Sequence, residues 1–183
     1  MEEKKKNAIL SEVLDYVKVI IFAVVFVLIV NNFILINALV PSESMEKTIM
    51  TGDRIFGFRL AYEFEEPERF DIVIFKYPDD PEQKELYIKR VIGLPGERIQ
   101  IRDGQILING ETYREGRDLP KISNPGLATN EVYLESDEYF VLGDNRNNSE
   151  DSRYADVGNV KKKYIAGKIW FRVTPVKKAG FLK

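Results

Sequence analysis

The longest run of hydrophobic residues lies near the N-terminus of this 183-residue chain. Every residue from Val19 to Val30 is apolar, and beyond Asn31-Asn32 apolar residues continue with one polar interruption to Val40. A helix over Tyr16 to Val40 would rise roughly 37 Å, enough to cross a hydrocarbon core of about 30 Å. The tract has no polar face at helical spacing, which a buried core helix would normally show, and asparagines interrupt it only near its outer end. We therefore favour a membrane-spanning helix over a buried core helix or a cleavable signal peptide.

Basic residues flank this tract unequally. Lys4 to Lys6 and Lys18 precede its apolar part, whereas the first basic residues beyond it are Lys47 and Arg54. An excess of Lys and Arg marks the cytoplasmic flank of a membrane span. The pattern therefore predicts a single-pass protein of the cell membrane, with a cytoplasmic N-terminus and the rest of the chain outside.

After the predicted span, the hydrophobic pattern changes to short segments rich in β-branched and aromatic residues. The seven segments are Arg54 to Phe58, Asp71 to Tyr77, Leu86 to Ile92, Arg98 to Arg102, Gln105 to Asn109, Glu138 to Leu142 and Ile165 to Val173. They predict a mainly β, antiparallel domain. We expect a short cytoplasmic N-terminus at residues 1–15, a transmembrane anchor in the phospholipid bilayer at 16–40, and an extracytoplasmic β domain at 41–183.

One hairpin is indicated by its turn residues. Asp103-Gly104 separates two apolar segments, and Asp-Gly favours a two-residue turn in which both residues have positive φ. Asn109-Gly110 marks a second turn directly after the hairpin.

Composition restricts the chemistry that this chain can perform. It contains no His and no Cys, which removes the commonest general base, thiol nucleophiles, disulfides and the usual zinc ligands. Its 27 basic and 29 acidic residues give a net charge of −2, so nothing indicates a nucleic-acid partner. Catalysis would have to use Ser, Thr, Lys, Tyr or carboxylates, and no metal or organic cofactor is indicated.

Two serines, Ser42 and Ser44, follow the predicted span directly. Four extended residues reach only about 14 Å, so a reactive serine here would work at the membrane surface. Taken alone, serines after a proline are more often turn or helix-cap residues than nucleophiles. A nucleophilic role therefore requires a base elsewhere in the sequence.

Lys89 is the candidate base. Strand alternation places Tyr87, Lys89 and Val91 on one face of the segment from Leu86 to Ile92. Most strand lysines extend to solvent, and a lysine with a pKa near 10.4 cannot accept a proton from serine at neutral pH. Burial that lowers this pKa by about 2 to 3 units would make the free amine available.

A dense polar segment follows the predicted strand that ends at Leu142. A solvent loop does not need so many Asp, Asn, Ser and Arg residues, whereas a catalytic site needs hydroxyls and charge pairs to orient its base. Ser149 is a candidate to hydrogen-bond the lysine amine. The candidate ion pairs join Asp144 or Asp151 to Arg146 or Arg153.

Together these segments resemble the type I signal peptidases, the bacterial leader peptidases that use a Ser/Lys dyad. Four blocks carry the resemblance in order, at Pro41 to Met45, Asp71 to Pro78, Tyr87 to Gly96 and Gly143 to Tyr154. The resemblance implies an antiparallel, strongly bent β-sheet domain. It also implies a membrane-bound serine endopeptidase that removes signal peptides from exported preproteins, cutting after small residues at the outer membrane surface.

The resemblance also implies residue roles. Ser44 would be the nucleophile and Lys89 the general base, and the Ser42 hydroxyl with the Ser44 backbone N–H would form the oxyanion hole. Ser149 would hold the lysine. The supporting positions would be Asp144, Asp151 and Arg153.

Two segments depart from the family pattern. Lys47 stands where the family often has proline, and Ala155 to Gly158 replaces a stretch that commonly contains Trp, Gly and an aromatic residue. Two other functions fit the residues: a tethered, non-catalytic β domain for binding or adhesion, and a specialised Ser/Lys peptidase such as one that processes pilins.

Overall fold

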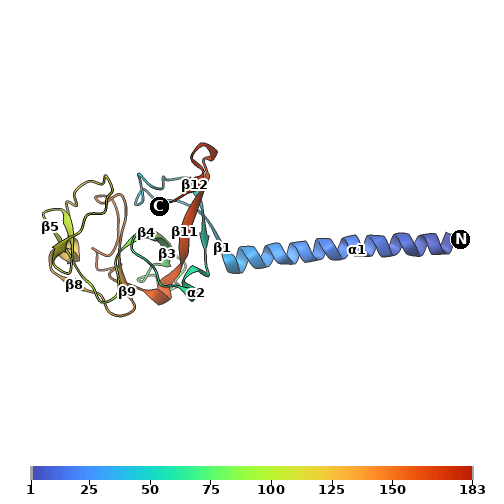
Figure 1. The fold of residues 1–183 in the computed structure, drawn as a ribbon, viewed down its shortest axis with the longest axis horizontal. Coiled ribbons are helices and arrows are strands. Elements are labelled where there is room, and N and C mark those ends of the chain that lie inside the picture. The colour runs from blue at the N-terminus through green and yellow to red at the C-terminus, as the bar shows by residue number, and fades with distance from the viewer. Residues whose placement is uncertain (1, 183) are drawn as a thin grey trace. The chain divides into compact units, whose positions relative to one another are not determined.

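The computed structural model describes residues 2–182, which divide into two compact units at residues 35 and 36. The first unit contains the long helix α1 (Glu2–Ile29) and the short π-helix η1 (Val30–Ile34) (Figure 1). Within the described residues, one helical segment, Glu12–Ile34, is long and apolar enough to cross a membrane. Its 23 residues would rise about 34 Å as a regular helix, which suffices for a core of about 30 Å.

The helix predicted over residues 16–40 is wrong at its C-terminal end. Helical structure ends at Ile34, and the next five residues form strand β1 (Leu35–Leu39). In β1 the side chain of Ile36 is buried in the core with Ile55 and Ile169. The apolar run is compatible with a helix or a strand, and pairing with the sheet selects the strand for its last residues.

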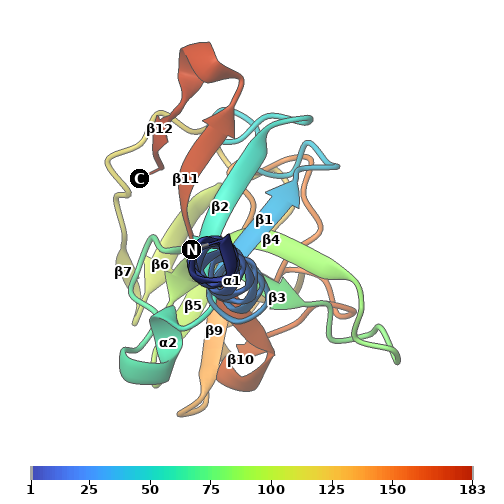
Figure 2. The same cartoon turned by 90° about the vertical axis from the view of Figure 1, so that its right-hand side faces the viewer.

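The second unit contains a large sheet, and the pairings among its strands from β2 onward are all antiparallel. Its further strands are β2 (Arg54–Phe58), β3 (Ile72–Lys76), β4 (Leu86–Gly93), β9 (Glu138–Leu142), β10 (Val160–Lys161), β11 (Ile165–Thr174) and β12 (Gly180–Phe181). The order is β1-β2-β11-β3-β4-β9-β10, with β12 paired to β11. Figure 2 shows β11 between β12 and β2. Three register shifts interrupt the pairing of β11 with β3 and β2, and such bulges bend a strand.

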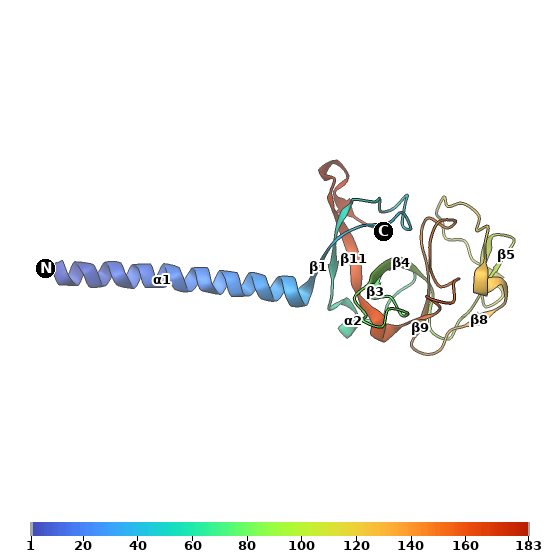
Figure 3. The same ribbon diagram turned by 180° about the vertical axis from the view of Figure 1, so that it is seen from behind.

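A smaller sheet has the order β7-β6-β5-β8. Its strands are β5 (Arg98–Arg102), β6 (Gln105–Ile108), β7 (Glu111–Thr112) and β8 (Val132–Tyr133). The hairpin predicted at Asp103-Gly104 is confirmed, because Arg102 pairs with Gln105 and the two turn residues have φ of 54° and 75°. Within the second unit, β5 and β8 lie at one end and β1 and β11 at the other (Figure 3).

The large sheet is buried on both faces at its strand β3. Ile72 and Ile74 pack into one cluster with residues of β1 and β11, while Val73 and Phe75 pack into another with β4 and β9. Short helices complete the unit at α2 (Ala61–Phe64), η2 (Gly126–Thr129), η3 (Lys162–Tyr164) and η4 (Val176–Lys178). The predicted mainly antiparallel β class with an N-terminal apolar helix is confirmed.

Candidate active site

Ser44 lies in the loop between β1 and β2, and that loop is held at both of its ends. The Val40 N–H donates to the Asp53 carbonyl at 2.9 Å, and a short helical turn is closed by the Ile49 N–H and the Met45 carbonyl at 2.8 Å. Met45 and Ile49 are buried beneath the turn. The Ser44 carbonyl accepts a hydrogen bond from the Asn145 N–H at 3.0 Å, which ties the loop to the polar segment after β9.

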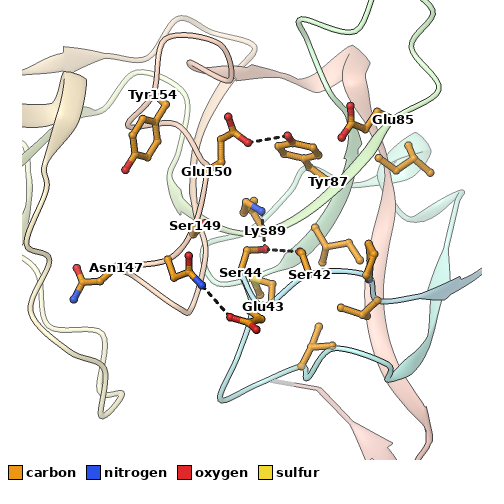
Figure 4. Close-up of a pocket in the computed structure, with 17 residues that line it drawn as sticks. Ser42, Glu43, Ser44, Glu85, Tyr87, Lys89, Asn147, Ser149, Glu150 and Tyr154 are labelled. Carbon is orange, nitrogen blue, oxygen red and sulfur yellow. Dashed lines mark hydrogen bonds between the residues drawn. The ribbon is translucent and has the colours of Figure 1, made fainter.

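Lys89 lies in the middle of β4 and its side chain is 3% exposed. It pairs across the sheet with Val73, whose side chain is fully buried. The Lys89 Nζ donates to the Ser44 Oγ at 2.8 Å (Figure 4). The structure therefore brings the two predicted dyad residues, which are 45 positions apart, into direct contact.

Burial changes the basicity of Lys89. Desolvation lowers the pKa of this amine from 10.5 to about 8, against the opposing charges of Asp151 and Glu150. Burial disfavours the ammonium form because an apolar environment solvates the charge poorly. At neutral pH an appreciable fraction of Lys89 is then the free amine, which can accept a proton from Ser44.

Ser42 is next to the nucleophile candidate. Its Oγ lies 3.3 Å from the Ser44 Oγ, and both residues line the same cleft (Figure 4). Within residues 2–182, the hydrogen bonds of Ser44 are those of its hydroxyl and its carbonyl. The Ser44 N–H thus has no hydrogen-bond partner among the residues that the structure describes.

Ser149 does not form the hydrogen bond to Lys89 that the sequence analysis suggested. Its Oγ is buried and has no hydrogen-bond partner among the residues that the structure describes, although Ser149 lines the cleft beside Lys89. Gly143 explains the close packing here. A Cβ at this position would lie 2.1 Å from the Ser149 Oγ and 2.4 Å from the Ser44 carbonyl, so a larger residue would displace the site.

Two buried ion pairs hold the polar segment behind the dyad. Arg153 donates from Nε to Asp151 at 2.7 Å, and the other Asp151 oxygen accepts from the Gly143 N–H at 3.0 Å. Asp144 accepts two hydrogen bonds from Arg90, at 2.8 and 2.6 Å, and both side chains are fully buried. Bidentate contacts of this kind fix geometry as well as charge.

Of the candidate ion pairs, Asp151 with Arg153 is therefore present and the pairing of Asp144 with Arg146 is wrong. Arg146 instead pairs with Glu115 at 2.6 Å, in a segment more than thirty residues earlier in the chain, and donates from Nε to the Gly143 carbonyl.

The dyad opens into a cleft of about 620 Å³. One wall comes from the loop before β2, a second from β4, and a third from the segment after β9 (Figure 4). Apolar side chains of Val40, Met45, Ile49 and Ile88 line the cleft beside the two serines. A buried amine in contact with a serine hydroxyl, at the floor of a partly apolar cleft, is an arrangement that could support nucleophilic catalysis.

The comparison with known families agrees with this chemistry. The family described as "Signal peptidase, peptidase S26" matches residues 13–174. The chain belongs to the signal peptidase family. This membership confirms both the resemblance found in the sequence and the predicted class of serine endopeptidase.

Relatives of this signal peptidase cover most of its length. A signal peptidase I from Leptolyngbya laminosa is 36% identical over 94% of this chain and 85% of the relative. A signal peptidase I from Bacillus amyloliquefaciens is 37% identical, with 90% of each chain covered. The crystal structure of a signal peptidase I from Enterococcus faecalis V583 is similar with a TM-score of 0.45 and 36% identity, covering 57% of this chain and 97% of that one.

Three residues at the signal peptidase's site were missed by sequence reasoning. Arg90 lies in one of the matching blocks but was given no role, and Glu115 lies outside every motif. Gly143 was part of a motif without an assigned role. Gly143 allows its backbone to approach the Ser44 carbonyl closely, and this contact is visible only in the folded structure.

Proposed function

We propose that this protein is a membrane-anchored endopeptidase that removes signal peptides from exported preproteins, with Ser44 as nucleophile and Lys89 as general base. The observation that carries the proposal is the 2.8 Å contact between the buried Lys89 amine and the Ser44 hydroxyl. Family membership supports the reaction class, and the cleft around the dyad provides room for an extended peptide.

The reaction would proceed in two halves. The free amine of Lys89 accepts the hydroxyl proton of Ser44 while the oxygen attacks the scissile carbonyl, and the tetrahedral intermediate collapses when Lys89 returns that proton to the departing amine. The signal peptide is then bound to Ser44 as an ester. Lys89 next takes a proton from water, hydroxide attacks the ester carbonyl, and the proton returns to the Ser44 oxygen.

The oxyanion that develops in each half would bind between the Ser42 hydroxyl and the Ser44 N–H. The 3.3 Å separation of the two serine oxygens supports this role, since a hydroxyl beside the nucleophile can rotate toward the new charge. Loss of one such donor typically costs about 3 to 4 kcal/mol of barrier.

The apolar helix explains how the site would meet its substrate. Ser44 follows Ile34, the last residue of the candidate span, by ten residues, so the chain tethers the nucleophile near a membrane surface. A signal peptide presents its cleavage site just beyond its own apolar segment. The distribution of lysines before the span supports an extracytoplasmic position for the catalytic domain.

The burial of Lys89 argues against a non-catalytic β domain. A desolvated amine costs stability, and an adhesion module would gain nothing from placing it against a serine hydroxyl. The apolar lining beside the serines supports apolar side chains in the substrate next to the cut, and the resemblance to the family adds that these are small.

Cleavage of a model preprotein tests the proposal. The full chain in detergent micelles should cut the preprotein once, and N-terminal sequencing of the product should place the cut after a small residue. Ser44→Ala should abolish the cleavage, whereas Ser136→Ala, at an exposed serine outside the cleft, should not change it. Undiminished cleavage by Ser44→Ala would refute the dyad, and a cut after large residues would refute the substrate class.

Labelling can test the orientation separately, because the chain contains no cysteine. Ser136→Cys should react with a membrane-impermeant maleimide added outside intact cells. Labelling that appears only after lysis would place the domain on the cytoplasmic side and contradict the proposed topology.

A further inference from the structure

Four side chains near Lys89 form a closed cycle of contacts, and two of them, Tyr87 and Glu150, line the cleft. The Tyr87 hydroxyl donates to the Glu150 carboxylate at 3.0 Å, and the Tyr77 hydroxyl donates to Asp156 at 3.3 Å. The two tyrosine rings stack with centroids 4.7 Å apart and an angle of 9° between their planes. The Glu150 and Asp156 carboxyl groups contact each other and so close the cycle.

This cycle joins two separate parts of the fold. Tyr87 belongs to β4, two residues before Lys89 and on the same strand face, whereas Glu150 and Asp156 belong to the segment after β9. Asp156 lies in the stretch from Ala155 to Gly158 that departs from the family pattern. The departure therefore supplies a partner for a residue of the cleft.

The cycle also touches the catalytic amine. The Lys89 Nζ lies 5.0 Å from the centroid of the Tyr87 ring, within the range of a cation–π contact. Tyr77 stacks on the aromatic ring of Tyr87, and Glu150 accepts a hydrogen bond from the Tyr87 hydroxyl. The Tyr87 side chain therefore cannot rotate away from the Lys89 amine without losing both contacts. Figure 4 shows Tyr87 and Glu150 meeting across the cleft above Lys89.

The charges that face Lys89 come from one element. Asp151 and Glu150 both favour the ammonium form, while Ser44 and Tyr87 are its neutral polar neighbours and Val73 lies beside it on β3. Asp151 is already neutralised by its ion pair with Arg153. Glu150 instead faces a phenol and a second carboxyl group, and this second group raises the pKa of Glu150.

We propose that Glu150 is a positioning residue for Lys89: it holds the Tyr87 ring against the amine and places a carboxylate charge beside it. The proposal rests on the proposed function, in which Lys89 is the base. Two effects follow. The anchored ring keeps the amine directed at Ser44, and the carboxylate sets the pH range in which the amine is free.

The pH profile of preprotein cleavage by the full chain in micelles separates these effects. Glu150→Gln keeps an acceptor for Tyr87 but removes the charge, so the acid limb of kcat should move to lower pH by about half a unit, with the plateau within about twofold of the parent. Glu150→Ala should show the same movement and also a plateau kcat reduced by about three- to tenfold, because the ring loses its anchor.

Two variants serve as comparisons. Tyr87→Phe keeps the carboxylate and removes the anchoring hydroxyl, so it should reduce the plateau kcat and leave the acid limb in place. Glu111→Gln makes the same chemical change as Glu150→Gln on β7, at an exposed position outside the cleft, and should reproduce the parent profile.

Three results would overturn the proposal. An acid limb that coincides in Glu150→Gln and the parent shows that the charge does not act on the base. A higher KM with unchanged kcat in Glu150→Ala shows that Glu150 contacts substrate instead. An equal shift in Glu111→Gln shows a general effect of net charge. Failure of the proposed function is distinguishable, because Lys89→Met would then keep its activity in the same assay.

Discussion

Replacing Lys89 by methionine should inactivate the enzyme and stabilise its fold at the same time. Burial lowers the pKa of Lys89 from 10.5 to about 8, and each pH unit of difference is worth about 1.4 kcal/mol. The protonated lysine therefore reduces the free energy of unfolding by about 3 kcal/mol. Methionine fills a similar volume without a charge, and it gives up one hydrogen bond to Ser44 that contributes about 1 kcal/mol.

The sign of the effect depends on pH. Below pH 8 both the folded and the unfolded chain carry the protonated lysine, so its full cost is present. Between pH 8 and 10.5 the unfolded chain binds more protons at this site, and the parent gains stability as the pH rises. Above 10.5 the cost is gone. The advantage of Lys89→Met should thus be about 2 to 3 kcal/mol at pH 7 and vanish near pH 11.

Denaturant unfolding of the full chain in micelles can measure this difference, followed by the fluorescence of Trp170, the one tryptophan of the sequence. Lys177→Met, at an exposed lysine, is the matched control and should show no pH-dependent advantage. A Lys89→Met protein that is less stable than the parent at pH 7, or equally more stable at pH 7 and 11, would refute the desolvation argument.

Three further predictions concern the site and its support. The kcat/KM of the parent should fall about tenfold per pH unit below pH 8, because protonation removes the Lys89 base; a flat profile from pH 8 to 6 would contradict this. Gly143→Ala should reduce kcat by at least tenfold, since its Cβ would lie 2.1 Å from the Ser149 Oγ; steady-state kinetics with a folded variant checks it. Asp144→Asn removes the charge that pairs with the buried Arg90, so it should lower the free energy of unfolding by about 3 to 5 kcal/mol in denaturant titrations. A loss below about 1 kcal/mol would show that the pair is not desolvated.

The strands and the hairpin could be predicted because their signals are local. An Asp-Gly turn selects its own backbone conformation, and period-two alternation identifies which side chains share a strand face. Alternation placed Lys89 with Tyr87 and Val91, and the structure buries its side chain. The two-residue strands β7, β8, β10 and β12 have no such pattern, so they were missed.

The end of the apolar helix could not be predicted from hydrophobicity. Residues 35–39 continue the apolar run with one polar residue, and they become β1 because the sheet offers Ile36 a buried place beside Ile55 and Ile169. That preference is set by tertiary packing, which a hydrophobic run does not encode.

The dyad could be proposed from the motifs, but the supporting contacts could not. Arg90 meets Asp144 across 54 residues, and Arg146 meets Glu115 across 31. Spacing along the chain does not indicate such partners. The polar segment after β9 also suggested a hydrogen bond from Ser149 to Lys89 that the structure does not form, because the exact position of a hydroxyl depends on tertiary packing such as the close approach at Gly143.

The most direct test of the Ser/Lys dyad is the kcat/KM for one preprotein, measured for the parent, Ser44→Ala and Lys89→Met under identical conditions. Ser136→Ala and Lys177→Met serve as matched controls. We predict that both dyad variants lose at least about a thousandfold while remaining folded, and that both controls match the parent. Cleavage by either dyad variant within tenfold of the parent rate would contradict the assignment of nucleophile and base.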